Sequence, residues 1–198
     1  MAKIRTFIAI DPPEDIRILI ERFQRELRRN GPGIRWEAPS KFHSTIKFLG
    51  DVEESLLSSI YPIVEFTART HVKFHVTYEE FGVFPDRKHP KVLWIGCTDR
   101  DGSLRRFKRE LDEALGPLGF EIEAKEFRPH VTLGRVKTPE RIHDLLSLAE
   151  NLNFEPRDAD VDGILVMKSM LNLQGAEHSL LKKISLPTSP IADTHAQT

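Results

Sequence analysis

Two segments of this 198-residue chain repeat one short pattern: a histidine, any residue, a threonine and an apolar residue. The first copy begins at His43 and includes Thr45, and the second begins at His130 and includes Thr132. Residues i and i+2 of a strand point to the same face, so each histidine shares a face with its threonine. If the two strands border one cavity, two imidazoles and two hydroxyls converge there.

This set of groups suits displacement at phosphorus. An imidazole titrates at about pH 6.5, so one histidine can accept a proton while the other donates one. In-line displacement needs proton transfer at two opposite oxygens, and the hydroxyls of Thr45 and Thr132 can hydrogen-bond the non-bridging oxygens. The repeated pattern therefore predicts phosphoester chemistry with His43 and His130 as the acid/base pair.

A cation follows each histidine. Lys47 stands four residues after His43, and Arg135 stands five residues after His130. Either cation can neutralise phosphate charge. In an ideal strand Lys47 shares the face of His43, whereas Arg135 points away from His130. Arg135 is therefore useful only if its strand twists or ends there.

The two histidines also allow other interpretations. A single His-x-Thr is common by chance and usually marks a strand histidine with a satisfied hydrogen bond. A zinc site is weakly supported, because two histidines without a third spaced ligand do not define one. We therefore expect no metal and no cofactor. The remaining alternative is a module that binds a nucleotide or RNA phosphate without turnover. Only the enzyme requires both imidazoles.

The elements that carry these residues alternate irregularly along the chain. The histidine strands are expected at residues 42–49 and 131–136. Further strands are expected at 4–10, 34–37, 72–84, 92–97, 160–170 and 178–186, and helices at 16–29, 55–66, 104–115 and 141–151. This order is not a regular strand–helix–strand alternation, so it predicts an α+β fold with antiparallel sheets.

Composition bounds the class of protein. The chain has 29 Lys and Arg against 30 Asp and Glu, which excludes a globally basic nucleic-acid coat but not a local phosphate site. A hydrophobic share of 39% without a long apolar run indicates a soluble protein that does not contact a membrane. Cys97, the only cysteine, can form neither an internal disulfide nor a cysteine zinc site. No targeting signal is apparent, so a cytoplasmic location is expected.

The chain is expected to form one domain with a short tail. Residues 188–198 are polar and lack periodicity, so they are expected to be a disordered C-terminal tail, and residues 1–187 a single domain. We expect a monomer.

Several blocks besides the histidine segments resemble one family. In order, residues 5–11, 36–43, 82–85, 90–96 and 127–135 are similar to segments of the 2H phosphoesterase superfamily. Within it, the chain resembles the RNA 2′,3′-cyclic phosphodiesterases, historically called 2′-5′ RNA ligases. The resemblance covers about residues 4–186. It implies a bilobal fold of two antiparallel sheets related by a pseudo-two-fold axis, with helices on the outer faces and a cleft between the lobes.

The resemblance also implies an activity and a set of roles. The activity is metal-independent hydrolysis of a terminal 2′,3′-cyclic phosphate on RNA or nucleotides to a 2′-phosphate, with ATP-independent 2′-5′ ligation as the reverse direction. By position, His43 and His130 are the acid/base pair, Thr45 and Thr132 bind phosphate, and Arg135 matches a phosphate-contacting arginine.

The chain departs from the family pattern in two segments. Ser44 replaces the usual leucine or isoleucine and is expected to face away from the cleft. Near the end of the chain, Glu177 and His178 stand where relatives often have a tyrosine, which leaves substrate preference open.

The remaining candidates have simpler interpretations. The basic turn at residues 87–89 is expected to be a solvated loop, with an RNA contact as the alternative. Trp94 and Phe48 are expected to pack in the core, and Lys168 and Ser169 to lie on a plain sheet face.

Overall fold

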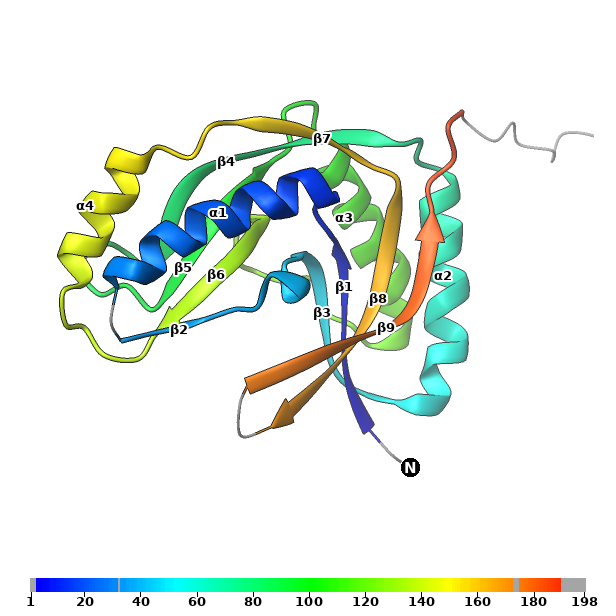
Figure 1. The fold of residues 1–198 in the computed structure, drawn as a ribbon. Helices are drawn as coiled ribbons and strands as arrows, with labels where there is room; N and C mark the ends of the chain where they lie inside the picture. Colours follow the sequence, from blue (N-terminus) through cyan, green and yellow to red (C-terminus); the bar gives the residue numbers. More distant parts are fainter. Residues whose placement is uncertain (1–2, 32, 173–174, 190–198) are drawn as a thin grey trace, which may run out of the picture.

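In the residues that the computed structural model describes, 3–31, 33–172 and 175–189, nine strands and four α-helices follow one another (Figure 1). The strands are β1 (Lys3–Ile10), β2 (Ile34–Trp36), β3 (Ser44–Glu53), β4 (Phe74–Phe84), β5 (Val92–Thr98), β6 (His130–Val136), β7 (Arg157–Val161), β8 (Gly163–Asn172) and β9 (Gly175–Ser185). The helices are α1 (Glu14–Asn30), α2 (Leu57–Arg69), α3 (Ser103–Leu115) and α4 (Ile142–Leu152).

The strands form two antiparallel groups that meet at one point. The order across the sheet is β7-β4-β5-β6-β3-β1-β8-β9, with β2 paired to β6 beside this path. Strands β3 and β6 are joined only by the antiparallel pair Ser44 and Val131. The two expected sheets are therefore linked at the centre into one curled antiparallel sheet. The α+β class with antiparallel sheets is confirmed.

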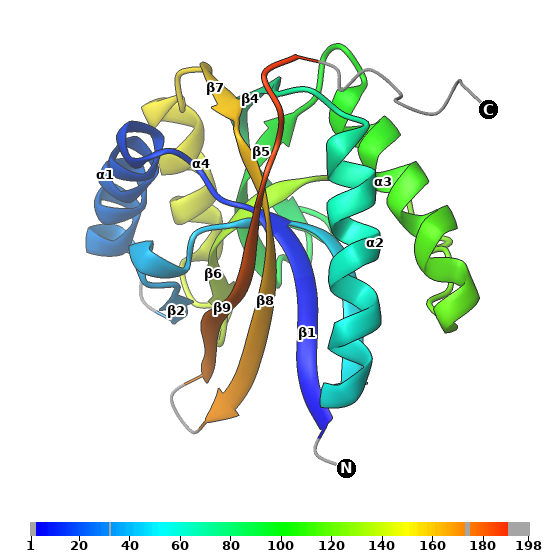
Figure 2. The ribbon, with the colours of Figure 1, turned by 90° about the vertical axis from the view of Figure 1, so that its right-hand side faces the viewer.

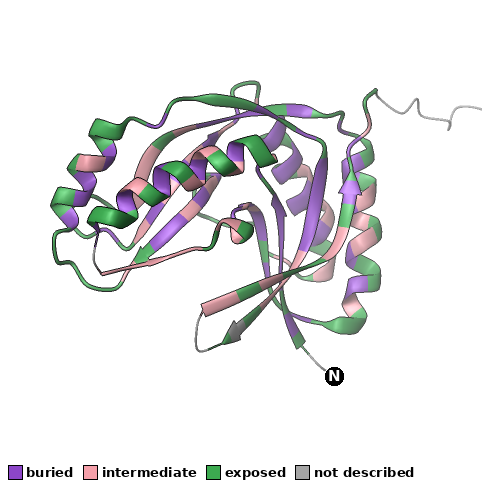
Figure 3. Cartoon of the chain, in the orientation of Figure 1, coloured by how far each residue is buried: buried purple, intermediate pink, exposed green. Residues whose placement is uncertain are grey.

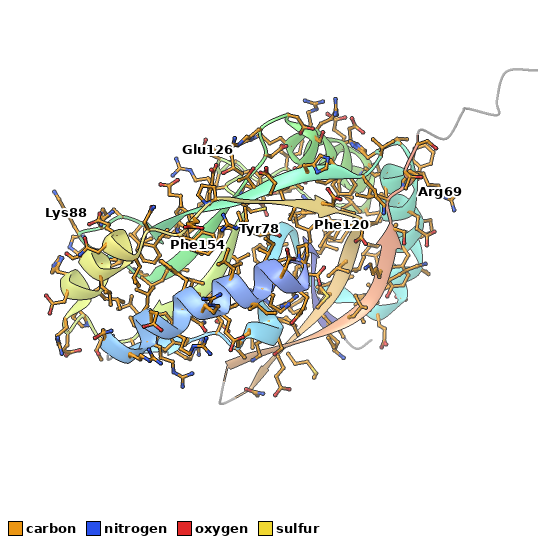
Figure 4. All side chains as sticks on the ribbon, turned by 45° about the horizontal axis from the view of Figure 1, so that its top comes forward. Arg69, Tyr78, Lys88, Phe120, Glu126 and Phe154 are labelled. Atoms are coloured by element: carbon orange, nitrogen blue, oxygen red, sulfur yellow. The ribbon has the colours of Figure 1, made fainter. Side chains whose placement is uncertain are left out.

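Helices cover the outer side of each strand group. Helices α1 and α4 lie together on one side of the molecule, and α2 and α3 lie on the other (Figure 2). The apolar stripe of α1 is buried, and its Phe23 ring lies 5.9 Å from Phe81 on β4 and 5.4 Å from Phe154 after α4. Phe154 is labelled at this interior position in Figure 4. Acidic residues begin α1 and arginines end it, as the helix dipole favours.

The core runs along the sheet beneath these helices. The central strands are buried along most of their length (Figure 3). On α3, the predicted stripe is fully buried and consists of Leu104, Phe107, Leu111 and Leu115. This packing fixes the backs of the strands and leaves their other face free to form a site. None of the helices in the described ranges is long and apolar enough to cross a membrane.

One predicted strand is wrong. The hydrophobic pattern predicts a single strand over residues 160–170, but β7 ends at Val161 and β8 begins at Gly163. Strand β7 pairs with β4, whereas β8 pairs with β1 and β9. The chain changes strand group at Asp162, a change that local hydrophobic alternation does not mark. Of the predicted tail at 188–198, residues 190–198 lie outside the described residues.

Candidate active site

A β-bulge interrupts each histidine strand at the same distance from its histidine. In β3 the extra residue, Ile46, follows Thr45, and in β6 the extra residue, Leu133, follows Thr132. A bulge inserts one residue on one strand and shifts the alternation of faces beyond it. The fifth residue after each histidine, rather than the fourth, therefore returns to the face of the histidine.

Both histidine segments line one cavity of about 510 Å³. His43, Thr45, His130 and Thr132 all contribute to its wall. An antiparallel register centred on the single β3–β6 pair brings Thr45 alongside His130 and His43 alongside Thr132. The structure thus brings together the four groups that the repeated pattern singled out.

The two imidazoles are oriented in the same way. Nδ1 of His43 lies 2.7 Å from the carbonyl oxygen of Lys41, and Nδ1 of His130 lies 2.7 Å from that of Arg128. A carbonyl oxygen only accepts, so in each ring Nδ1 carries the hydrogen. In the neutral form Nε2 is then the nitrogen that can take a proton, and both rings are prepared for acid/base work.

Burial makes both rings poor bases in the free protein. Burial lowers the pKa of His43 to about 4, against the opposing effect of its bond to the Lys41 carbonyl. Burial also lowers the pKa of His130, and the nearby Arg135 guanidinium lowers it further. Both imidazoles are therefore mainly neutral at neutral pH before a phosphate enters.

Aromatic side chains hold the two rings. The centroid of Phe7 lies 4.9 Å from that of His43, and Phe84 lies 4.9 Å from His130 in an edge-on arrangement. Trp94, expected in the core, is half-buried, and its ring lies 6.1 Å from His130. Phe48 is not in the core either. It lines the cavity with 59% of its surface exposed, because the bulge returns it to the face of His43.

The prediction for Lys47 is wrong. The bulge turns Lys47 to the helix side of the sheet, where it is 1% exposed. Its Nζ donates to Oδ1 of Asp112 at 2.7 Å and to the Glu121 carbonyl at 2.9 Å. Lys47 is absent from the cavity wall, so it is no phosphate ligand.

Arg135 has the opposite orientation to Lys47 and faces the cavity. The bulge at Leu133 places Arg135 on the face of His130, although strict alternation would have turned it away. Its Nε lies 3.7 Å from Oε1 of Glu37 on the cavity wall. The condition set for Arg135, a departure of its strand from ideal geometry, is met.

A third histidine enters the cavity. His178 on β9 lies with its ring centroid 5.1 Å from that of His43 and 5.1 Å from that of Phe7. Its Nδ1 is buried without a hydrogen-bond partner among the residues that the structure describes. Ser169, expected on a plain sheet face, lines the same wall, whereas Lys168 does not. The sequence marks His178 only as a departure from the family pattern, since no local spacing connects it to His43.

The other sequence candidates lie elsewhere. Ser44 is fully buried and does not line the cavity, as expected. In the basic turn, Arg87 pairs with Glu150, and Lys88 projects outward at the far end of the molecule (Figure 4). The turn takes no part in the histidine cavity.

Within the described ranges no group of three or more His, Cys, Asp or Glu side chains is placed to hold a metal ion. Burial raises the pKa of the Cys97 thiol to about 12, so it is not a nucleophile at neutral pH. Four cationic side chains among the described residues line the cavity and can meet negative charge on a ligand: Arg5, Arg35, Lys41 and Arg135.

A repeated antiparallel fold with paired His-x-Thr segments in one cationic cavity defines the class of 2H phosphoesterases. Comparison with known proteins agrees. The family model described as LigT like Phosphoesterase matches twice, over residues 10–94 and 95–176. The chain belongs to the LigT-like phosphoesterase family and is an enzyme. This excludes the alternative of a binding module without turnover.

Curated relatives and solved structures lie in the same family. The proteins named RNA 2′,3′-cyclic phosphodiesterase from Thermotoga maritima and Methanothermobacter thermautotrophicus are each 32% identical, covering 90% and 87% of this chain and 93% and 94% of theirs. The crystal structure of TT0787 of Thermus thermophilus has a TM-score of 0.77 at 26% identity, over 92% of this chain and 97% of its own. The E. coli LigT structure, at 20% identity and a TM-score of 0.73 over 94% of this chain and 99% of its own, shares the fold.

Proposed function

We propose that this phosphoesterase opens terminal 2′,3′-cyclic phosphates of RNA, leaving a 2′-phosphate. The observation that carries the proposal is the pair of identically oriented imidazoles, His43 and His130, on one cavity with Thr45 and Thr132. The names of the relatives support the substrate class. E. coli LigT has been crystallised with 3′-AMP, which fits a cavity for a nucleotide.

The chemistry follows from two opposite proton transfers. A water molecule attacks phosphorus and gives its proton to Nε2 of one neutral histidine. The bond from phosphorus to the ribose 3′ oxygen breaks, and the second histidine, protonated, donates its proton to that oxygen. The product keeps the phosphate on the 2′ oxygen. The same sequence of steps, with a 5′ hydroxyl in place of water as the attacking group, joins two RNA ends through a 2′-5′ bond without ATP.

We assign His43 as the base in hydrolysis and His130 as the acid. The pKa of His43 is lowered to about 4, so this ring is neutral over the working range. His130 must hold a proton, and the negative charge of a bound phosphate raises its pKa toward the range where it does. The two Nδ1–carbonyl bonds keep both Nε2 atoms available for these transfers.

The remaining groups bind the substrate. Thr45 and Thr132 donate hydroxyl hydrogen bonds to the non-bridging oxygens, and Arg135 stabilises the negative charge that builds up on them. The exposed ring of Phe48 offers a flat apolar surface at the cavity edge, on which a base can stack.

Phosphorus NMR of an RNA with a 2′,3′-cyclic end tests the function directly. We expect the cyclic signal to be replaced by that of a 2′-phosphate, with EDTA present throughout. A 3′-phosphate product would reverse the assignment of the leaving oxygen. A rate abolished by EDTA and restored by zinc or magnesium would refute metal-free catalysis.

We also propose that residues 1–187 form a single bilobal domain and that the protein is a cytoplasmic monomer. A single buried cysteine is compatible with a reducing compartment. Sedimentation of the full chain tests the oligomeric state.

A further inference from the structure

The cavity holds more positive charge than one phosphodiester requires. Among the described residues, four cations line it, Arg5, Arg35, Lys41 and Arg135, against one carboxylate, Glu37. Lys41 donates its Nζ to the backbone of β9 at 2.8 Å, and Arg135 lies near Glu37. Among the described residues Arg5 and Arg35 have no ion-pair or hydrogen-bond partner for their side chains. Two guanidinium groups thus face the cavity uncompensated.

Arg35 stands in a position that favours an anion. Strand β2 pairs Arg35 directly with Arg135 on β6. Like charges directly opposite each other on one sheet face are destabilising, and an anion near the pair relieves the repulsion. Arg35 also extends toward the other strand group, because its Nη1 lies 3.6 Å from the position that a Cβ would take on Gly175. Its guanidinium therefore lies beside the start of β9.

Arg5 comes from the opposite wall. Strand β1 pairs Arg5 with Ser169 on β8, and Ser169 pairs with His178 on β9. These three residues form one row across the wall of the first strand group, and all three line the cavity. Arg5 and Arg35 thus border the cavity from both strand groups, next to the residues assigned to the reacting phosphate.

The reacting cyclic phosphate carries one negative charge, which Arg135 and the two threonines address under the proposed function. We propose that Arg35 and Arg5 form a subsite for a second phosphate, on the 5′ side of the terminal nucleoside. The enzyme then selects cyclic ends that carry this phosphate over free 2′,3′-cyclic nucleosides. The inference rests on the proposed function for its placement of the first phosphate. The second phosphate has two sources, the linkage of an RNA chain or a 5′-phosphate on a nucleotide.

Four substrates separate these cases, all ending in a 2′,3′-cyclic phosphate. They are a nucleoside with a free 5′ hydroxyl, the same nucleoside with a 5′-phosphate, a dinucleotide, and a dinucleotide with an uncharged methylphosphonate linkage. We expect the natural dinucleotide to exceed its methylphosphonate analogue roughly 10-fold in kcat/KM, as charge-assisted hydrogen bonds of this kind allow. A plot of log kcat/KM against the logarithm of the salt concentration should have a slope steeper by about 0.7 for the natural dinucleotide than for the analogue.

Variants assign the preference to residues. Arg35→Gln and Arg5→Gln should each reduce the ratio of charged to uncharged dinucleotide and flatten the salt dependence. Arg35→Lys should keep the steeper salt dependence, because it keeps the charge. Arg29→Gln is the matched control: Arg29 is exposed on α1, pairs with Glu26 at 2.9 Å, and does not line the cavity. This control should keep the wild-type ratio.

The rates on the four substrates either support or overturn the subsite. A gain for the 5′-phosphorylated nucleoside as well as the dinucleotide supports the subsite and shows that a terminal phosphate fills it. A gain for the dinucleotide alone supports the subsite and ties it to the chain. Equal rates for the natural and methylphosphonate dinucleotides, or an unchanged ratio in both glutamine variants, overturn it. If no cyclic end is opened, the proposed function fails separately, and calorimetric binding of the two dinucleotides still tests the subsite.

Discussion

The two halves of the site share the same backbone geometry around their histidines but differ in the side chains that face the cavity. In each half a histidine is held by a carbonyl two residues earlier, and a bulge lies three residues after it. The fifth residue after the histidine then faces the cavity, Phe48 in one half and Arg135 in the other. One repeated strand geometry therefore supplies an apolar surface on one side and a positive charge on the other.

The fourth residue after the histidine also differs between the two halves, because it contacts different neighbours in each. In the first half it is Lys47, whose side chain points to α3 and donates a hydrogen bond to Asp112. In the second half it is Gly134, where a Cβ would lie 2.8 Å from Cγ2 of Ile34 on β2. Strand β2 packs so closely on β6 that only glycine fits without a shift. The same strand carries Arg35 to the cavity, so the small residue at 134 permits this strand to bring a cation close to Arg135.

Removing either histidine should have the largest effect. We expect His43→Ala and His130→Ala each to lower the rate of cyclic phosphate opening by about 10²–10⁴-fold. The double variant should be little worse than either single one, because the two groups act as a unit. Steady-state rates on a cyclic nucleotide provide the measurement. Wild-type turnover in both single variants would refute the acid/base pair.

A modified substrate distinguishes the two histidines. With sulfur in place of the 3′ oxygen, the leaving group departs without a proton. The His130→Ala variant should then recover most of its lost rate, while His43→Ala should not. Recovery in the opposite variant would exchange the two roles.

Lys47→Met should reduce stability more than it affects chemistry. Lys47 and Lys108 share the buried Asp112, with Nζ to Oδ distances of 2.7 and 2.6 Å. Removing one partner of a buried ion pair costs about 3 kcal/mol or more. We expect a lower urea midpoint, with the KM for cyclic phosphate nearly unchanged. A KM raised as far as that of an Arg135 variant would return Lys47 to the phosphate site.

The fifth position of each half should respond differently to substitution. Arg135→Gln should lower kcat/KM roughly 10- to 100-fold and act on kcat, since it removes charge stabilisation of the transition state. Phe48→Leu should mainly raise KM, by roughly 10-fold, because stacking contributes to binding. The split between kcat and KM is the measurement. The same split in both variants would contradict the division between a charged and an apolar half.

The pH profile should show the smallest effect, a displacement rather than a loss. Burial lowers the pKa of both histidines, and the productive free enzyme has His43 neutral and His130 protonated. As pH rises through the lowered pKa of His130, that form is lost, so the fall of kcat/KM should be centred below the ordinary histidine pKa of 6.5. Bound phosphate raises both pKa values, so the optimum of kcat should lie at higher pH. Superimposed kcat and kcat/KM profiles would contradict this coupling.

Local patterns in the chain identified the two histidines that line the cavity. His43 with Thr45 and His130 with Thr132 depend only on the two-residue period of a strand, which holds before any bulge intervenes. The buried stripe of α3 and the antiparallel class of the fold also follow from periodicity and the order of elements.

Tertiary structure decided which of the two candidate cations lines the cavity. Arg135 faces the cavity and Lys47 does not because of the two bulges. A bulge exists only in relation to the partner strand that sets the register. The break between β7 and β8 has the same origin, because each strand is defined by different neighbours. Arg35 comes from β2, which pairs with β6 and not with β3 that follows it in the chain, and His178 comes from β9, far from both histidine segments in the chain. Their approach to the cavity depends on packing between distant strands, a property that residue spacing along one segment does not contain.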